Sequence, residues 1–182
     1  MAAQLNFVMF TGRLLGFANG KFFDIHALSG GGGGSKNPNR PSVHYDPDII
    51  NNPYMTGRRT TNQRRGGTIP RGRYFICRPA KHPHLGLSAR LVPRVADFMN
   101  YRGGFYIHAR GPRGSDGCIV PMEKFQELMR ALSAESISSD ETENGKKKDD
   151  KTKDKSKDNA TSQDDICGYL IVMEHEDGWR SA

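Results

Sequence analysis

The sequence contains no apolar run of the roughly 20 residues that a transmembrane helix needs, and it has only three cysteines among 182 residues. A small, odd number of cysteines in a chain of this length excludes a disulfide scaffold and leaves at least one thiol free. The first ten residues have neither a basic segment nor a small-residue cleavage site, so we expect no Sec signal peptide. A membrane protein is therefore disfavoured, and one domain with flexible segments is expected.

Charge is unevenly distributed along the chain, whose formal net charge is +7. Residues 133–165 contain seven Lys and ten Asp or Glu with almost no large apolar residue, so this segment is acidic and the remainder is strongly basic. It cannot bury enough apolar surface to offset its ordering entropy, and we predict a disordered charged insertion. Residues 30–67 begin with five glycines, which could be native or engineered, and the rest of this segment is rich in Pro and Arg. We predict that it forms a flexible loop or lid. The whole chain, residues 1–182, is expected to form a single domain.

Short apolar segments separated by Gly, Pro and Asn-Gly turns predict a mainly β fold. Asn19-Gly20 gives the strongest hairpin signal. One amphipathic helix is expected over 121–132, with Pro121 in its first turn. After the charged insertion the chain returns to an apolar, β-branched pattern, so the sheet closes across that insertion. The expected strands cover residues 4–10, 13–17, 21–27, 73–78, 88–92, 104–108 and 166–173.

The residues best suited to chemistry lie between Gly104 and Pro121. His108 ends an expected strand, and Cys118 precedes the expected helix, where the helix dipole would lower the thiol pKa and favour a nucleophilic thiolate. The loop between them is long enough to bring the imidazole to the sulfur as its base. Gly117 permits a sharp turn, and the amides of Gly117 and Cys118 could face a developing oxyanion. The alternative is an ordinary buried cysteine and a hydrogen-bonded strand-end histidine.

The pattern His-x-x-Gly-x-x-Gly-Ser-Asp-Gly-Cys-Ile over residues 108–119 resembles the active-site signature of L,D-transpeptidases. The resemblance is closest to the type VI secretion L,D-transpeptidase effector family, in the YkuD-like superfamily. Residues 66–74 and the hairpin at 13–27 also resemble elements of these enzymes. Three departures are Ala109 after the histidine instead of Gly, Gly67-Thr68 instead of Gly-Pro, and the charged insertion. The resemblance implies a YkuD-like β-sandwich with one helix after the catalytic cysteine.

The resemblance also implies a cofactor-independent enzyme that acts on peptidoglycan stem peptides. Cys118 would attack the meso-diaminopimelate carbonyl, release D-Ala and form a thioester, while His108 takes the thiol proton and later activates the acceptor. Water as acceptor gives L,D-carboxypeptidase activity, a free D-amino acid gives exchange, and a stem amine gives a cross-link. The family further implies an antibacterial toxin secreted into the periplasm of a target cell, and a cognate immunity protein that covers the cleft. Neither nucleic-acid binding nor membrane insertion is implied.

Further side chains are assigned around the catalytic pair. Arg110 and Arg113 could hold substrate carboxylates, or could equally be ordinary solvated loop residues. The resemblance assigns Tyr74 to the substrate site. Asp116 could orient His108 or a loop arginine, or cap the following turn, and we favour a structural role. Ser115 and Ala109 are the remaining supporting residues.

The sequence also offers two other classes of function. Possible zinc ligands are present, but their spacing matches no common zinc motif, so no metal is expected; they are Cys77, His82, His84, His108 and Cys118. A basic nucleic-acid-binding module would explain the arginine-rich segment, although no recognised motif is present. Cys77 and Cys167 are expected in buried strands, where they could pair in an oxidising compartment if those strands are neighbours.

Overall fold

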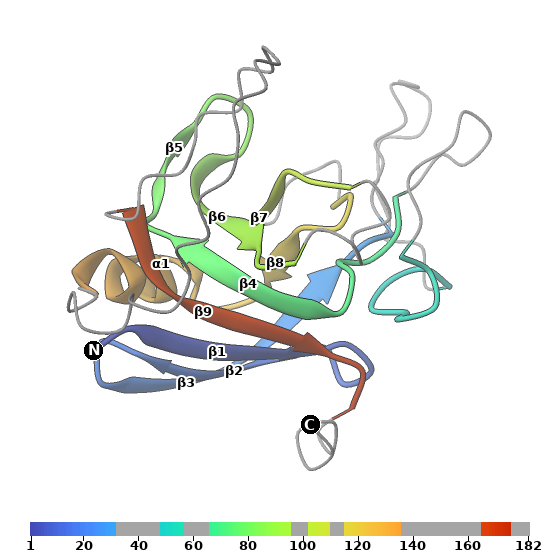
Figure 1. The fold of residues 1–182 in the computed structure, drawn as a ribbon, viewed down its shortest axis with the longest axis horizontal. Coiled ribbons are helices and arrows are strands. Elements are labelled where there is room, and N and C mark those ends of the chain that lie inside the picture. Colours follow the sequence, from blue (N-terminus) through green and yellow to red (C-terminus); the bar gives the residue numbers. More distant parts are fainter. Residues whose placement is uncertain (32–47, 57–65, 96–101, 110–114, 136–164, 176–182) are drawn as a thin grey trace, which may run out of the picture.

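Figure 1 shows the computed structural model, which describes residues 1–31, 48–56, 66–95, 102–109, 115–135 and 165–175. Within these residues the chain is mainly β with one helix, which confirms the expected class. In chain order the elements are β1 (Ala3–Val8), β2 (Arg13–Ala18), β3 (Lys21–Ser29), β4 (Gly72–Cys77), β5 (Ala80–His82), β6 (Gly86–Pro93), β7 (Phe105–His108), β8 (Ile119–Pro121), α1 (Phe125–Ala134) and β9 (Ile166–Met173).

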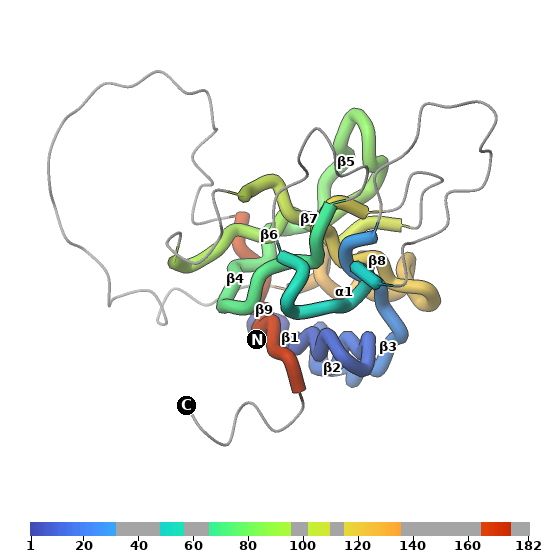
Figure 2. The backbone as a smooth tube through the Cα atoms, turned by 90° about the vertical axis from the view of Figure 1, so that its right-hand side faces the viewer, coloured from blue at the N-terminus to red at the C-terminus, as the bar shows by residue number. Residues whose placement is uncertain are grey.

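The strands form one sheet that closes on itself. Its order is β4-β9-β1-β2-β3-β8-β7-β6, and β4 also pairs with β6, while β5 extends the sheet beyond β6. Most neighbours are antiparallel, and the exceptions are the parallel pairs β1–β9 and β7–β8. The expected sandwich of separate layers is thus replaced by a continuous sheet that curves around one core, as the tube in Figure 2 also shows. Closure leaves both β4 and β6 with a partner on each side.

Strand alternation and α1 supply the core. Along β1, for example, Ala3, Leu5 and Phe7 are buried, as expected for a strand with one face inward. α1 contacts β2, β6 and β9, which lie on opposite sides of the closed sheet, so the helix covers one of its ends. The buried helix residues are Leu128, Met129, Ala131 and Leu132. No helix among the described residues has the length and apolar character that a membrane span requires.

The predicted start of the helix is wrong. Pro121 ends strand β8, which pairs with β3, and α1 begins only at Phe125, after Lys124 adopts a left-handed conformation at φ 50°. The apolar residues 119–121 therefore serve the sheet and not the first helical turn. This strand and β5 are three residues long, too short for their periodicity to be recognised in the sequence.

Both segments predicted to be flexible have described parts that are well packed. At the charged insertion, α1 runs on to Ala134, and the buried carboxylate of Glu135 accepts a hydrogen bond from the Asn19 N–H. Within the predicted loop, Asn51 accepts from the Ser29 N–H at 2.7 Å. The insertion therefore begins later than predicted, and part of the loop packs on β3. Residues 32–47, 57–65 and 136–164 lie outside the described residues.

Cys77 and Cys167 lie on neighbouring strands, as their proposed pairing requires. β4 is antiparallel to β9, and Cys77 is the register partner of Ile166. Both thiols are free and buried, and burial raises the pKa of Cys167 to about 12. The pairing stays a hypothesis for an oxidising compartment.

Candidate active site

The parallel pairing of β7 with β8 brings His108 and Cys118 to one face of the sheet. Ile107 is the register partner of Ile119, and both isoleucines point into the core. His108 follows Ile107 and Cys118 precedes Ile119, so alternation turns both functional side chains to the opposite face. Two adjacent strands with this offset separate the two Cα atoms by about 8 Å. The imidazole and the thiol can bridge such a separation.

The hydrogen bond made by His108 fixes its role. Its Nδ1 lies 2.7 Å from the carbonyl oxygen of Ala109, and because a carbonyl only accepts, Nδ1 carries the proton. The lone pair of the neutral ring is then on Nε2. His108 is 4% exposed, and burial lowers its pKa below the usual 6.5. The ring is therefore neutral at pH 7 and suited to act as a base through Nε2.

Burial of Cys118 favours the protonated thiol at pH 7. The residue is 8% exposed, and burial raises the pKa of its thiol to about 11. Its Sγ donates a long hydrogen bond to the Gly104 carbonyl at 3.9 Å. The predicted thiolate at a helix N-terminus is wrong, because β8 separates Cys118 from the first residue of α1, Phe125. The helix dipole therefore does not favour a thiolate at this position.

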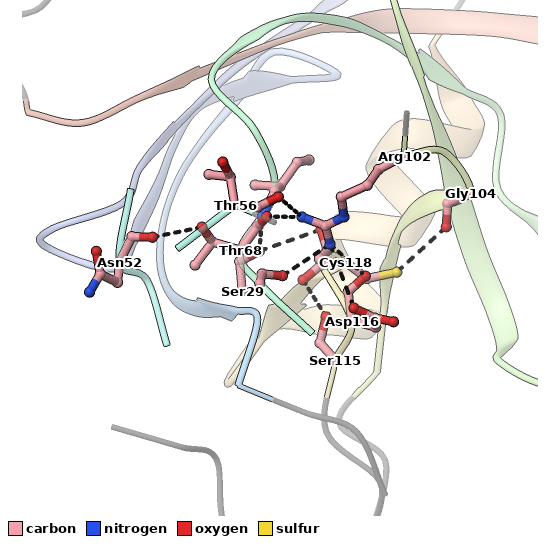
Figure 3. A network of polar contacts seen from close by, with 12 residues as sticks. Ser29, Asn52, Thr56, Thr68, Arg102, Gly104, Ser115, Asp116 and Cys118 are labelled. Carbon is pink, nitrogen blue, oxygen red and sulfur yellow. Dashed lines mark hydrogen bonds and ion pairs between the residues drawn. The ribbon is translucent and has the colours of Figure 1, made fainter. Parts of the chain in front are cut away.

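The turn that carries Cys118 is held by its backbone carbonyls (Figure 3). Ser115 Oγ donates to the Cys118 carbonyl at 2.6 Å, and Ser29 Oγ donates to the Gly117 carbonyl at 3.4 Å. The Asp116 carbonyl accepts from the Arg102 guanidinium at 3.2 Å. Three successive carbonyls are thus anchored by three different side chains.

The guanidinium of Arg102 lies at the centre of this network. Its side chain is 5% exposed, and Nη1 donates to the carbonyls of Thr56 and Thr68, both at 2.6 Å. Nη2 donates to the Gly67 carbonyl at 3.1 Å and to that of Asp116. The Asp116 carboxylate adds an ion pair at 3.6 Å. Arg102 therefore ties the segments around residues 56, 67 and 116 into one unit, and it is the residue of the site that sequence reasoning missed.

These carbonyl anchors orient the two amides that were predicted to stabilise an oxyanion. In a trans peptide the C=O and the following N–H point in opposite directions. The N–H of Gly117 therefore points away from Arg102, and the N–H of Cys118 points away from Ser29. Gly117 has φ +90°, and a Cβ placed there would lie 2.3 Å from the Arg102 Nη2. Only glycine allows this close approach.

The structure gives the other predicted site residues different positions and roles. Tyr74 has no exposed surface, and its hydroxyl donates to the Pro70 carbonyl at 2.7 Å, so its assignment to substrate binding is wrong and it is a core residue. Asp116 faces Arg102, in line with the favoured structural role. Ala109 contributes its carbonyl to His108. Arg110 and Arg113 lie outside the described residues.

The alternative sites receive no geometric support from the described part of the chain. No three His, Cys, Asp or Glu side chains are grouped there in a way that could hold a metal ion. Of the arginines behind the nucleic-acid alternative, Arg71 forms an ion pair with Glu174 at 2.7 Å, and Arg58, Arg59, Arg64 and Arg65 lie outside the described residues. Comparisons with protein-family models, curated proteins and solved structures returned no match to this chain.

The reactivity of Cys118 should depend steeply on pH. With a thiol pKa near 11, the thiolate fraction rises about tenfold for each pH unit between 7 and 9. We expect the rate of alkylation by iodoacetamide to rise in the same proportion, measured by peptide mapping that separates Cys118 from Cys77 and Cys167. A rate that is flat from pH 7 to 9 would instead indicate a preformed thiolate.

Proposed function

We propose that this protein is a cysteine acyltransferase that acts on peptidoglycan stem peptides, as an L,D-carboxypeptidase or an L,D-transpeptidase. One observation carries the chemical part of the proposal: the β7–β8 register turns Cys118 and His108 to the same face, with the His108 Nδ1 held by a carbonyl. The substrate class depends on the resemblance of residues 108–119 to the L,D-transpeptidase signature. A YkuD-like fold belongs to the same proposal.

The geometry favours a general-base mechanism that starts from a neutral pair. The thiol turns from the Gly104 carbonyl toward the Nε2 of His108, which takes its proton as Sγ attacks the carbonyl carbon of the donor residue. The negative charge on the carbonyl oxygen is stabilised by the N–H groups of Gly117 and Cys118. Collapse breaks the peptide bond, and the imidazolium gives its proton to the leaving amine of D-Ala. A thioester on Cys118 and a neutral His108 remain.

The second half of the reaction releases the acyl group. His108 takes a proton from water or from an amine, which attacks the thioester carbonyl; the thiolate leaves and recovers the proton from the imidazolium. Both Cys118 and His108 are largely buried, so a peptide reaches them only after neighbouring groups move aside. Water yields a trimmed tripeptide, whereas a D-amino acid yields an exchanged tetrapeptide. We extend the proposal to a secreted antibacterial toxin in the target periplasm, with an immunity protein that covers this site.

Mass spectrometry of disaccharide tetrapeptides incubated with the protein tests the proposal. We expect loss of D-Ala from the tetrapeptide, and on addition of D-methionine a product in which D-Met replaces D-Ala if exchange is possible. Arg130→Gln, a change on the exposed face of α1, serves as the matched active control. Intact tetrapeptide in both conditions would exclude the proposed activity, and binding of single-stranded or duplex nucleic acid in its place would favour the alternative module.

A further inference from the structure

A pocket beside the catalytic pair has no role in the reaction as described above. It has a volume of about 330 Å³ and lies between β5, β6 and the polypeptide that enters β9. Its lining includes Ser88 and Arg90 from β6, Tyr106 from β7 and His82 from β5. We call it the β5–β6 pocket.

The sheet register connects this pocket to the active site. Ser88 is the register partner of His108, and Arg90 is that of Tyr106, so all four side chains share the face that carries Cys118. β6 lies two strands from β8 in the sheet order, which places the β6 wall of the pocket about 10 Å from the backbone of β8. An extended peptide covers that distance in about three residues. A substrate held at Cys118 can therefore reach into the pocket.

The charge of the lining is predominantly positive. Arg78 and Arg90 contribute two cations, against the single carboxylate of Asp165. One nitrogen of Arg78 donates to the Ser133 carbonyl at 2.7 Å, which holds that side chain in place. Lys81 also borders the pocket, but it is the register partner of Leu87, so its side chain lies on the face of β5 opposite to His82 and Ser88. Cations gathered at a concave site favour a carboxylate ligand.

One wall of the pocket is rigid. The ring of His82 meets that of Tyr106 edge to face at 5.0 Å. The Nδ1 of His82 accepts hydrogen bonds from the N–H groups of His84 and Leu85 at 3.2 and 3.3 Å. A pocket with a fixed aromatic wall and cationic neighbours can select one orientation of a flexible peptide at a lower entropic cost.

We propose that the β5–β6 pocket is a carboxylate subsite that holds an acidic group of the stem peptide remote from the scissile bond. This inference depends on the proposed function. Two groups of a tetrapeptide stem fit the distance: the α-carboxylate of the γ-linked D-Glu, and the distal carboxylate of meso-diaminopimelate. The D-Ala carboxylate adjoins the bond that is cleaved and lies too close to the sulfur to reach β6.

Three substrates distinguish the two sources: the unmodified tetrapeptide, one amidated on D-Glu, and one amidated on the distal carboxyl of diaminopimelate. For the wild-type protein we expect amidation of the bound group to raise KM about 3- to 10-fold while kcat stays within twofold, because a partly exposed charge contact supports binding only. In Arg90→Gln the unmodified substrate should show a similar rise, and the same amidation should add little more. Lys81→Gln, on the opposite face of β5, is the matched control, and Arg130→Gln is the control remote from the pocket.

The outcomes separate the subsite from the proposed function. Release of D-Ala with a KM that neither amidation nor Arg90→Gln alters overturns the subsite and leaves the function standing. A fall in kcat at constant KM in Arg90→Gln also overturns it. Failure of the wild-type protein to release D-Ala from the unmodified peptide overturns both. Thermal unfolding of each variant identifies any effect that comes from loss of the fold.

Discussion

Replacing Cys118 by Ala is expected to reduce D-Ala release at least a thousandfold, to the background of the assay. The thioester route is lost entirely, because the alanine methyl group has no nucleophilic atom in place of the sulfur. His108→Ala should cost about 10²- to 10⁴-fold, the usual contribution of a general base. Time courses of tetrapeptide conversion, followed by mass spectrometry, measure both effects.

The combination of the two substitutions provides the sharper test. If Sγ and Nε2 act as one unit, the double variant should be no slower than Cys118→Ala alone. Both residues are largely buried, so thermal unfolding of each variant is needed to establish that it is folded at the assay temperature. Retention of a tenth or more of the turnover by folded Cys118→Ala would exclude the sulfur as the nucleophile.

The pH dependence of turnover follows from the same neutral pair. Because burial lowers the pKa of His108, the imidazole becomes protonated, and inactive as a base, only below its usual titration range. The thiol keeps its proton well above pH 9. Turnover should therefore rise with pH on the acid side of 6.5 and stay level through pH 8, because the imidazole takes the thiol proton during the attack.

The sequence predicted the secondary structure correctly where local signals determine it. Asn19 and Gly20 adopt φ values of 49° and 70°, as the expected tight hairpin turn requires. The last strand, Ile166–Met173, has the predicted bounds. The charged insertion before it does not affect this prediction, since an apolar and β-branched run of eight residues favours a strand wherever it occurs in the chain.

Prediction from the sequence failed where the pairing of strands distant in the chain determines the local structure. Pro121 is compatible with a first helical turn, but it also fits the end of a strand, and pairing with β3 selects the strand. That choice moved the helix away from Cys118 and removed the reason for expecting a thiolate. Tyr74 was assigned by resemblance alone, and no pattern in the sequence distinguishes a core tyrosine from one in a binding site.

Arg102 illustrates a different limit. It stands between Tyr101 and Gly103 in a polar, glycine-containing stretch, where an arginine is ordinarily solvated. Its burial depends on carbonyls supplied by segments 46, 34 and 14 residues away in the sequence. Only the assembled fold brings those acceptors together. Cys118 and His108 could be singled out as the candidate nucleophile and base because their side chains are chemically distinctive, whereas the groups that bind Arg102 are ordinary backbone carbonyls.

Replacing Arg102 by Ala should damage stability and turnover together. Removal of the guanidinium leaves the carbonyls of Thr56, Gly67, Thr68 and Asp116 without this donor, and unsatisfied buried acceptors cost about 1–3 kcal/mol each before water enters. Allowing for water, we expect a loss of about 3 kcal/mol and a fall in melting temperature of about 6–12 °C. Arg13→Ala, which breaks the half-exposed ion pair with Asp24, should cost below about 1 kcal/mol and serves as control.

The effect of Arg102 on turnover should persist in protein that is fully folded. The guanidinium fixes the Asp116 carbonyl and thereby the direction of the Gly117 N–H, so its loss misaligns one oxyanion donor, a defect that costs about 10²- to 10³-fold in kcat. Arg102→Lys keeps the charge but cannot serve four carbonyls, and we expect an intermediate rate. Assays at least 15 °C below the melting temperature of each variant separate alignment from unfolding. If kcat in folded Arg102→Ala equals that of Arg13→Ala, the network only stabilises the fold, and the Gly117 amide takes no part in catalysis.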